Sequence, residues 1–268
     1  MHESLQKQIE GEIINGYDCE TCKKKVDISK RVLLSSAPNV LIVHLQRIIF
    51  NFDTFRNDKI NTFFEFPYHL DLNPYSFYEV MKKEGRSRKA KGTDDEEVVE
   101  SEDSKWPEEE TCWEYKLVGT VVHSGTAQAG HYWSYINTKR GHSEPASTDP
   151  DWVKTESDPW MEFNDSNVRN FNFEKMKEEC FGSDGGHSSG GYDSWGWGGS
   201  SGKSAYMLIY ERREKKPIKV LVSEEEAKDD GDAKYDAKKE EYFKLIDYRK
   251  GIEEIAPSKI YQRVQEDN

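Results

Sequence analysis

The sequence is poor in three features that mark large classes of proteins: cysteine, long apolar runs and positive charge. Its 268 residues include only four cysteines, too few for a disulfide-rich secreted domain, so a reducing compartment is expected. It has no apolar run long enough to cross a bilayer and no signal peptide at Met1, which argues against a membrane partner. Lys and Arg number 38 against 51 Asp and Glu, and the formal net charge of -13 argues against nucleic acid as a partner. We therefore expect a cytoplasmic protein, or one that is also nuclear.

The length of the chain allows one large domain or two small ones, with enough residues to bury a core. Two segments are too poor in apolar residues to pack in that core: residues 79–111, where a basic block precedes an acidic one, and the Gly/Ser-rich residues 182–202. Both are expected to be flexible insertions. Residues 213–268 are a charged tail that we expect to be partly helical, with one apolar helical face made by Tyr242, Leu245, Ile246 and Ile252.

Local patterns predict two short helices and a buried strand. Leu5 and Ile9 are four residues apart, which indicates one face of a helix. Asn172 is a suitable helix N-cap and Gly182 a suitable stop, and the helix between them would bury Cys180. The most apolar run of the chain, residues 40–47, predicts a buried central strand.

The segment from residue 115 to residue 136 predicts a strand, a glycine-bearing loop and a second strand. In the first strand Tyr115, Leu117, Gly119 and Val121 alternate with their neighbours, so these four are expected on one buried face. The loop, residues 124–130, turns the chain back, and His131 then opens the second strand.

About thirty residues further on, the chain reaches Asn164 and Asp165, which a pair of strands could bring beside His131. A histidine next to an amide and a carboxylate is suited to act as a general base that a neighbour orients. A histidine at the start of a strand is more often a hydrogen-bonded structural residue, and the residues alone leave both roles open.

Cys19 and Cys22 form a Cys-x-x-Cys pair. Two thiolates at this spacing can bind one Zn²⁺ from a tight turn, but a structural zinc site needs four ligands. Cys112 and Cys180 stand alone in the sequence and do not provide a second pair. A metal-free or redox-active pair is therefore the alternative.

Three separated segments, residues 115–136, 160–168 and 204–211, resemble the histidine-box half of the ubiquitin-specific proteases. These are papain-like cysteine proteases that cut ubiquitin from its conjugates. The resemblance covers roughly residues 1–212 and is nearest to the large members whose catalytic domain is embedded in a helical-repeat chain. It implies an α+β, papain-like fold with a mainly antiparallel β palm and half of a zinc-finger-like fingers region, and with the helical thumb absent.

The resemblance also implies roles for single residues. His131 corresponds to the family's general base and Asn164 to the residue that orients it, with Asp165 next in line. The histidine-box strands supply the residues expected to bind substrate: His123, Gly130 and Tyr132. Ubiquitin and ubiquitinated proteins are the expected partners.

The sequence contains half of the zinc ligands that the resemblance implies, and it lacks the nucleophile. By resemblance, Cys19 and Cys22 match the second of two zinc-binding pairs, so the chain is expected to carry half of a zinc site. The family's reactive cysteine lies in a helix-start segment near the beginning of the domain, and this sequence has no such segment. Cys112 does not precede a helix and is interpreted as incidental.

Two functions remain. The chain is either the C-terminal part of a deubiquitinase catalytic domain, cut at both ends and inactive alone, or a catalytically inactive module that binds ubiquitin or serves as a scaffold.

Overall fold

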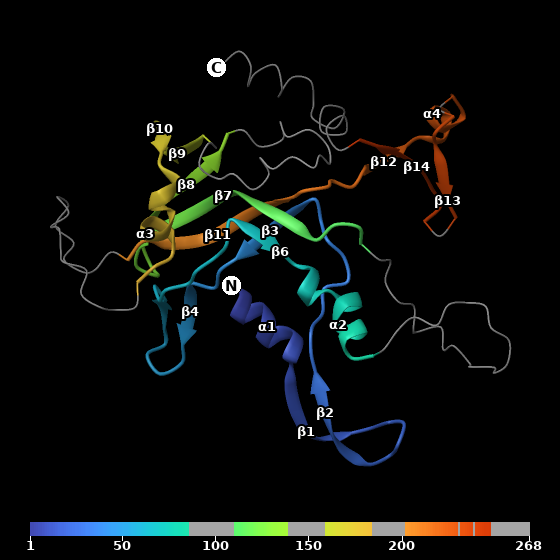
Figure 1. Ribbon diagram of the computed structural model, residues 1–268, viewed down its shortest axis with the longest axis horizontal. Helices are drawn as coiled ribbons and strands as arrows, with labels where there is room; N and C mark the ends of the chain where they lie inside the picture. The colour runs from blue at the N-terminus through green and yellow to red at the C-terminus, as the bar shows by residue number, and fades with distance from the viewer. Residues whose placement is uncertain (86–109, 139–158, 184–201, 230, 238, 248–268) are drawn as a thin grey trace. The chain divides into compact units, whose positions relative to one another are not determined.

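The computed structural model describes residues 1–85, 110–138, 159–183, 202–229, 231–237 and 239–247 (Figure 1). The chain divides into two compact units, Met1–Arg213 and Glu214–Asn268. Antiparallel β-sheets with a few short helices make up most of what is described. No helix in these ranges is both long and apolar enough to cross a membrane.

The largest sheet of the first unit has seven strands, all paired antiparallel (Figure 1). Six strands follow the order β10-β9-β8-β7-β11-β3, and a seventh, β6, pairs with β7. Their bounds are β3 Val40–His44, β6 His69–Asp71, β7 Glu114–Gly125, β8 Gly130–Asn137, β9 Trp160–Asn164, β10 Asn167–Phe171 and β11 Ser204–Arg212. The predicted strand-loop-strand segment is therefore confirmed as β7 and β8.

The core-facing side of β7 changes partway along the strand. Leu117 and Val118 are both buried, and beyond them the fully buried positions are Thr120 and Val122. In the pairing with β11, Leu117 and Gly119 oppose consecutive residues and Val118 has no partner, which is a β-bulge. An extra residue exchanges the two faces of a strand, so the prediction that Val121 shares the buried face of Tyr115 and Leu117 was wrong.

The apolar run at residues 40–47 forms β3, which lies at the end of the sheet order and pairs with β11. The prediction of a central strand was wrong. Leu41 and Val43 pack against the core, whereas the Ile42 side chain between them is 57% exposed. An unbroken apolar run is typical of a strand covered on both faces, and here only one face is covered.

Three helical segments flank the sheet. α1, His2–Glu10, packs Leu5 and Ile9 against the core, as their spacing predicts. η1, Asn73–Tyr75, leads into α2, Phe77–Lys83, so the expected insertion does not begin at residue 79. Ser76 caps α2 by accepting a hydrogen bond from the Glu79 N–H, and such a cap stabilises a helix. The charged composition on which the prediction of an insertion rested does not reveal this cap. Residues 86–109 and 184–201 of the two expected insertions lie outside the described residues.

The segment after β10 confirms the predicted capped helix. Asn172 accepts a hydrogen bond from the Glu174 N–H and starts a 3₁₀ turn, η3, Phe173–Lys175. α3, Met176–Cys180, follows, and Cys180 is fully buried.

Two hairpins complete the first unit. β1, Glu12–Asp18, pairs with β2, Lys25–Lys30, and β4, Ile48–Asn51, pairs with β5, Arg56–Lys59.

The second unit holds a three-stranded sheet in the order β12-β14-β13 and one short helix. The elements are β12 Ile218–Val222, α4 Glu224–Asp229, β13 Lys234–Asp236 and β14 Glu241–Ile246. The tail does contain a helix, but Tyr242, Leu245 and Ile246 lie in β14 and not on a helical face. These residues pair with β12, a strand rich in β-branched residues. Strand pairing decides their conformation because it contributes more than the helical spacing of a few apolar residues. Ile252 lies outside the described residues.

Candidate active site

The imidazole of His131 and the side-chain amide of Asn164 meet at one end of the large sheet. Nε2 of His131 lies 2.7 Å from Oδ1 of Asn164, within hydrogen-bond distance. The His131 side chain is 48% exposed, so a reacting group has access to the ring. The ring also stacks on Trp133, with the ring centroids 5.9 Å apart. These contacts hold the imidazole in one orientation while its other edge stays open, as a general base requires.

Strand register explains why two residues 33 positions apart come together. Ser124 at the end of β7 pairs with His131 at the start of β8. Tyr135, four residues later in β8, pairs with Glu162 of β9. Because side chains alternate along a strand, His131 shares the face of Tyr135, and Asn164 shares the face of Glu162. The antiparallel pairing therefore places His131 and Asn164 on the same side of the sheet.

Asp165 lies farther from the imidazole than Asn164 does. Its Oδ2 is 3.9 Å from Nε2 of His131, and its side chain is 77% exposed. Asp165 follows β9 in the short turn to β10, with φ at 52°, the left-handed region that aspartate tolerates better than most residues. Asp165 is thus close enough to pair with a protonated His131 but does not form the short contact.

A buried carboxylate lies under Asn164. Glu162 accepts two hydrogen bonds from Arg169, at 3.0 Å from Nε and 2.8 Å from Nη2. The Asn164 amide nitrogen lies 3.4 Å from Oε1 of the same carboxylate. The Glu162 side chain is 7% exposed and that of Arg169 is 71% exposed. The exposed guanidinium of Arg169 therefore covers the buried carboxylate of Glu162. This ion pair raises the pKa of the Arg169 guanidinium.

The hairpin strand β5 holds the loop that precedes His131. The ammonium of Lys59 donates to the carbonyl oxygens of His123, at 3.0 Å, and Gly202, at 2.7 Å. The amide of Gln128 donates to the carbonyl oxygen of Asn57 at 2.8 Å. The residue before the loop and a residue within it are therefore bound to one strand, which fixes the path of the chain into β8.

The three residues predicted to bind substrate lie together, but they differ in exposure. Gly130 and Tyr132 are exposed, and Tyr132 places its ring 4.4 Å from that of His123. His123 itself is 2% exposed, and burial, followed by the charge of Lys59, lowers its pKa. A Cβ on Gly130 would overlap the His123 imidazole. In this structure His123 therefore supports the surface that Gly130 and Tyr132 form.

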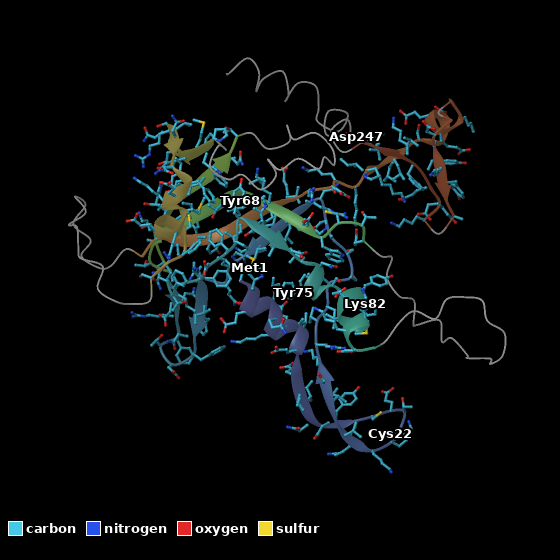
Figure 2. All side chains as sticks on the ribbon, viewed as in Figure 1. Met1, Cys22, Tyr68, Tyr75, Lys82 and Asp247 are labelled. Atoms are coloured by element: carbon cyan, nitrogen blue, oxygen red, sulfur yellow. The ribbon has the colours of Figure 1, made fainter. Side chains whose placement is uncertain are left out.

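Cys19 and Cys22 lie in the loop between β1 and β2, where Figure 2 labels Cys22. The loop is a tight turn, in which the Lys23 N–H donates to the Cys19 carbonyl oxygen at 2.8 Å. Hydrogen bonds from the backbone and then the thiol of Cys22 lower the pKa of Cys19. Two adjacent thiols of this kind suit zinc, but they supply two of the four donors that a structural site needs. No group of three or more His, Cys, Asp or Glu positioned to hold a metal occurs among the residues that the structure describes.

The other two cysteines are buried. Cys180 is fully buried, and desolvation raises the pKa of its thiol. Cys112 is 6% exposed, and its thiol faces the carbonyl oxygen of Glu114 at 3.9 Å. Within the described ranges, no cysteine forms a hydrogen bond with His131.

The sequence reasoning missed Lys59, Glu162 and Arg169. Glu162 carries a recognisable signal, because residue 162 shares the strand face of residue 164. The other two carry none, since only the pairing of β10 with β9 places Arg169 beside Glu162 and only the folded hairpin places Lys59 under His123.

Comparison with known proteins identifies the class to which this fold and site belong. The family described as ubiquitin carboxyl-terminal hydrolase matches residues 2–210. The human ubiquitin carboxyl-terminal hydrolase 9Y is 34% identical over 186 residues, which are 67% of this chain and 7% of the relative. The probable ubiquitin carboxyl-terminal hydrolase FAF of Drosophila melanogaster is 35% identical over 242 residues, 84% of this chain and 8% of the relative. Human ubiquitin carboxyl-terminal hydrolase 34 is 34% identical over 216 residues, 79% of this chain and 5% of the relative.

The chain belongs to the ubiquitin carboxyl-terminal hydrolase family, as the three resembling segments predict. It spans 5% to 8% of the length of these relatives. Among solved structures, the Ubp8/Sgf11/Sus1/Sgf73 deubiquitinating module of SAGA bound to ubiquitin aldehyde is similar at a TM-score of 0.47 and 21% identity, over 80% of this chain and 34% of that one. The family assignment rests on the sequence matches and not on this likeness.

Proposed function

We propose that this chain is part of the catalytic domain of a cysteine-type deubiquitinase. The reaction is the thiol-dependent hydrolysis of the isopeptide bond at the C-terminus of ubiquitin. The observation that carries the proposal is the 2.7 Å contact between His131 and Asn164, in a chain of the ubiquitin carboxyl-terminal hydrolase family. This chain contributes the histidine and asparagine of the triad, and the cysteine comes from residues outside it.

We assign the roles of the two residues from the family resemblance, and the 2.7 Å contact between them supports the assignment. His131 removes the proton from the attacking thiol and later donates it to the leaving lysine amine. Asn164 orients the imidazole so that one nitrogen faces the thiol throughout. Asp165, at 3.9 Å, lies near enough to contact the imidazolium formed during the first step.

The burial of Cys112 and Cys180 supports a nucleophile from outside the chain. A thiol must be accessible and must ionise readily to attack a carbonyl carbon. The raised pKa of Cys180 opposes ionisation, and Cys112 is turned toward a backbone carbonyl. Neither thiol is suited to the reaction.

The remaining parts of the proposal concern architecture and location. Residues 1–212 are taken as the palm and half of the fingers of a papain-like domain without its thumb, and residues 213–268 as an appended tail. Cytoplasm, and also nucleus, are the proposed locations.

Ubiquitin is the proposed partner, and support comes from the names of the relatives, which describe ubiquitin carboxyl-terminal hydrolases.

A structural zinc ion is the proposed cofactor, with Cys19 and Cys22 as two of its four ligands. The ion would stabilise the end of the β1–β2 hairpin and take no part in the reaction. Metal analysis of a longer product of the same gene, compared with its Cys19→Ser/Cys22→Ser variant, tests this assignment. Equal zinc content in the two proteins would contradict it.

The test of the proposed activity is labelling by ubiquitin that carries a thiol-reactive electrophile at its C-terminus. This chain alone should not be labelled. A longer product of the same gene that includes the cysteine-bearing segment should be labelled, and His131→Gln should abolish the labelling. Labelling of this chain alone that Cys112→Ser prevents would overturn the proposal.

The second candidate is a catalytically inactive module that binds ubiquitin or acts as a scaffold. The absence of a thiol contact to His131 in the described ranges favours it. The same experiment separates the two functions, because an inactive module binds ubiquitin while the longer product stays unlabelled.

A further inference from the structure

We propose that Glu162 is a positioning residue of the candidate active site. Its buried carboxylate fixes the direction in which the Asn164 amide points, and thereby determines which nitrogen of His131 carries the proton. The catalytic meaning of this inference rests on the proposed function. Its structural part concerns this chain alone and is measurable without any activity.

The strand register places all four participating residues on one side of the sheet. Glu162 and Asn164 are two residues apart in β9 and therefore point the same way. Arg169 of β10 is the register partner of Glu162. His131 approaches the same face from β8, since Tyr135 of that strand pairs with Glu162. The line from Arg169 through Glu162 and Asn164 to His131 is thus built from three neighbouring strands.

The hydrogen bonds along this line differ in length. Arg169 donates two short hydrogen bonds to Glu162, at 2.8 Å and 3.0 Å, and these fix the plane of the carboxylate. The Asn164 amide nitrogen is 3.4 Å from Oε1 of Glu162, a long hydrogen bond. The contact from Asn164 to His131 is short, at 2.7 Å. Glu162 therefore acts less by the strength of its bond to Asn164 than by the orientation it permits.

Only one orientation of the Asn164 amide satisfies both neighbours. An ionised carboxylate accepts hydrogen bonds and cannot donate, so it requires the NH₂ group of Asn164 on its side. The amide oxygen then faces His131 and requires a donor there. Nε2 of His131 must carry the proton, and Nδ1 is left with the lone pair that a thiol proton needs.

The reversed amide would set its oxygen against the buried carboxylate. Two acceptors would then face each other with no proton between them. One of them, the Glu162 carboxylate, is only 7% exposed, so water cannot readily replace the missing donor. The same reversal would present NH₂ to His131 and move the imidazole proton to Nδ1, which removes the base. Glu162 thus excludes the inactive arrangement.

The experiment is ¹⁵N NMR of histidine-labelled chain at about pH 9, above the range in which an ordinary imidazole titrates. The His131 resonances are identified by their loss in His131→Gln. The chain should show His131 protonated on Nε2, with Asn164 NH₂ protons close to the Glu162 side chain. A wild-type chain with the proton on Nδ1 would overturn the proposal without any variant.

Two substitutions at residue 162 separate the acceptor from the charge. Glu162→Met removes every acceptor, and the ratio of the Nε2–H to the Nδ1–H form of His131 should fall about tenfold, the effect of losing one hydrogen-bonded orientation. Glu162→Gln keeps one amide oxygen that can accept from Arg169 and Asn164 together, so it should retain the wild-type ratio. An unchanged ratio in Glu162→Met, or an equal fall in both variants, would overturn the proposal.

The matched control is Glu178→Met, which removes an exposed carboxylate from α3 in the same unit. It should leave the His131 ratio unchanged. Failure of this inference is distinguishable from failure of the proposed function, because the tautomer is read in the isolated chain and the labelling is read in the longer product. If the longer product proves to be an active enzyme, Glu162→Met in that unmodified enzyme should lower kcat about tenfold with little change in KM.

Discussion

The ammonium of Lys59 lies 3.0 Å from the carbonyl oxygen of His123, and no carboxylate is among the two acceptors that the structure gives it. Burial, and then the charge of Arg47, lower the pKa of Lys59 to about 8. A neutral amine still has two N–H groups, so deprotonation leaves both hydrogen bonds possible. Lys59 is therefore a half-buried hydrogen-bond donor whose charge is a cost to the fold.

The first prediction concerns pH. Between about pH 8 and pH 10.5 the unfolded chain holds a proton on Lys59 that the folded chain has lost. The free energy of unfolding should consequently rise with pH across this window, and the cost of the half-buried charge is fully present below pH 8. Urea denaturation at a series of pH values measures the slope, and Lys59→Met should remove that part of it. NMR of ¹³C-labelled lysine should show one ammonium titrating near 8, and a Lys59 midpoint near that of exposed lysines would contradict the prediction.

The second prediction concerns the close approach of Gly130 to His123. A Cβ at residue 130 would overlap the His123 ring and the carbonyl oxygen of Ser124, and the second of these is backbone. Gly130→Ala should destabilise the unit by about 3 kcal/mol or displace the loop before His131. Gly119→Ala is the control, because its nearest neighbours would be 3.7 Å and 3.8 Å away, which is ordinary contact. Thermal denaturation compares the stability of the two variants. Similar losses of stability would contradict the prediction that residue 130 has no room for a Cβ.

The third prediction concerns a buried ion pair that closes the first unit. Arg212, whose side chain is 1% exposed, lies 3.1 Å from Glu110, and Glu110 also accepts from the Ala37 N–H at 3.1 Å. Glu110→Ala should cost about 3 to 5 kcal/mol, since it leaves the guanidinium buried without its carboxylate. Glu114→Ala breaks the more exposed pair with Arg213 and should cost less than about 1 kcal/mol. The free energy of unfolding in urea distinguishes these values, and equal effects would exclude a special role for Glu110.

The fourth prediction concerns thiol reactivity. Cys19 and Cys22 lie in a surface turn, whereas Cys112 and Cys180 are buried. A colorimetric disulfide reagent at neutral pH should modify two thiols of the native metal-free chain quickly and the other two only after denaturation. Cys19 should react first, because the hydrogen bonds from Cys22 lower its pKa. Fast reaction of three or more thiols would contradict the burial of Cys112 or Cys180.

Local sequence predicted the elements that depend on neighbouring residues. The spacing of Leu5 and Ile9 gave α1, Asn172 gave the capped turn before α3, and Cys180 lies buried as expected. These features depend on helix periodicity and on hydrogen bonds within a few residues, which the sequence contains in full.

Features that depend on distant partners were missed or wrong. The bulge at Val118 reversed the buried face of β7, and β3 lies at the end of the sheet although its sequence is typical of a central strand. Periodicity states which residues alternate, but it does not state where an extra residue enters a ladder or how many neighbours a strand has.

The sequence by itself determined the family, and it predicted which residues act as the base and its orienting residue, because both are read from short motifs in a fixed order along the chain. Only the tertiary structure decided what surrounds them. It set Glu162 and Arg169 beneath Asn164 and Lys59 beneath His123, because strand pairing joins residues whose separation in the chain carries no information about their contact.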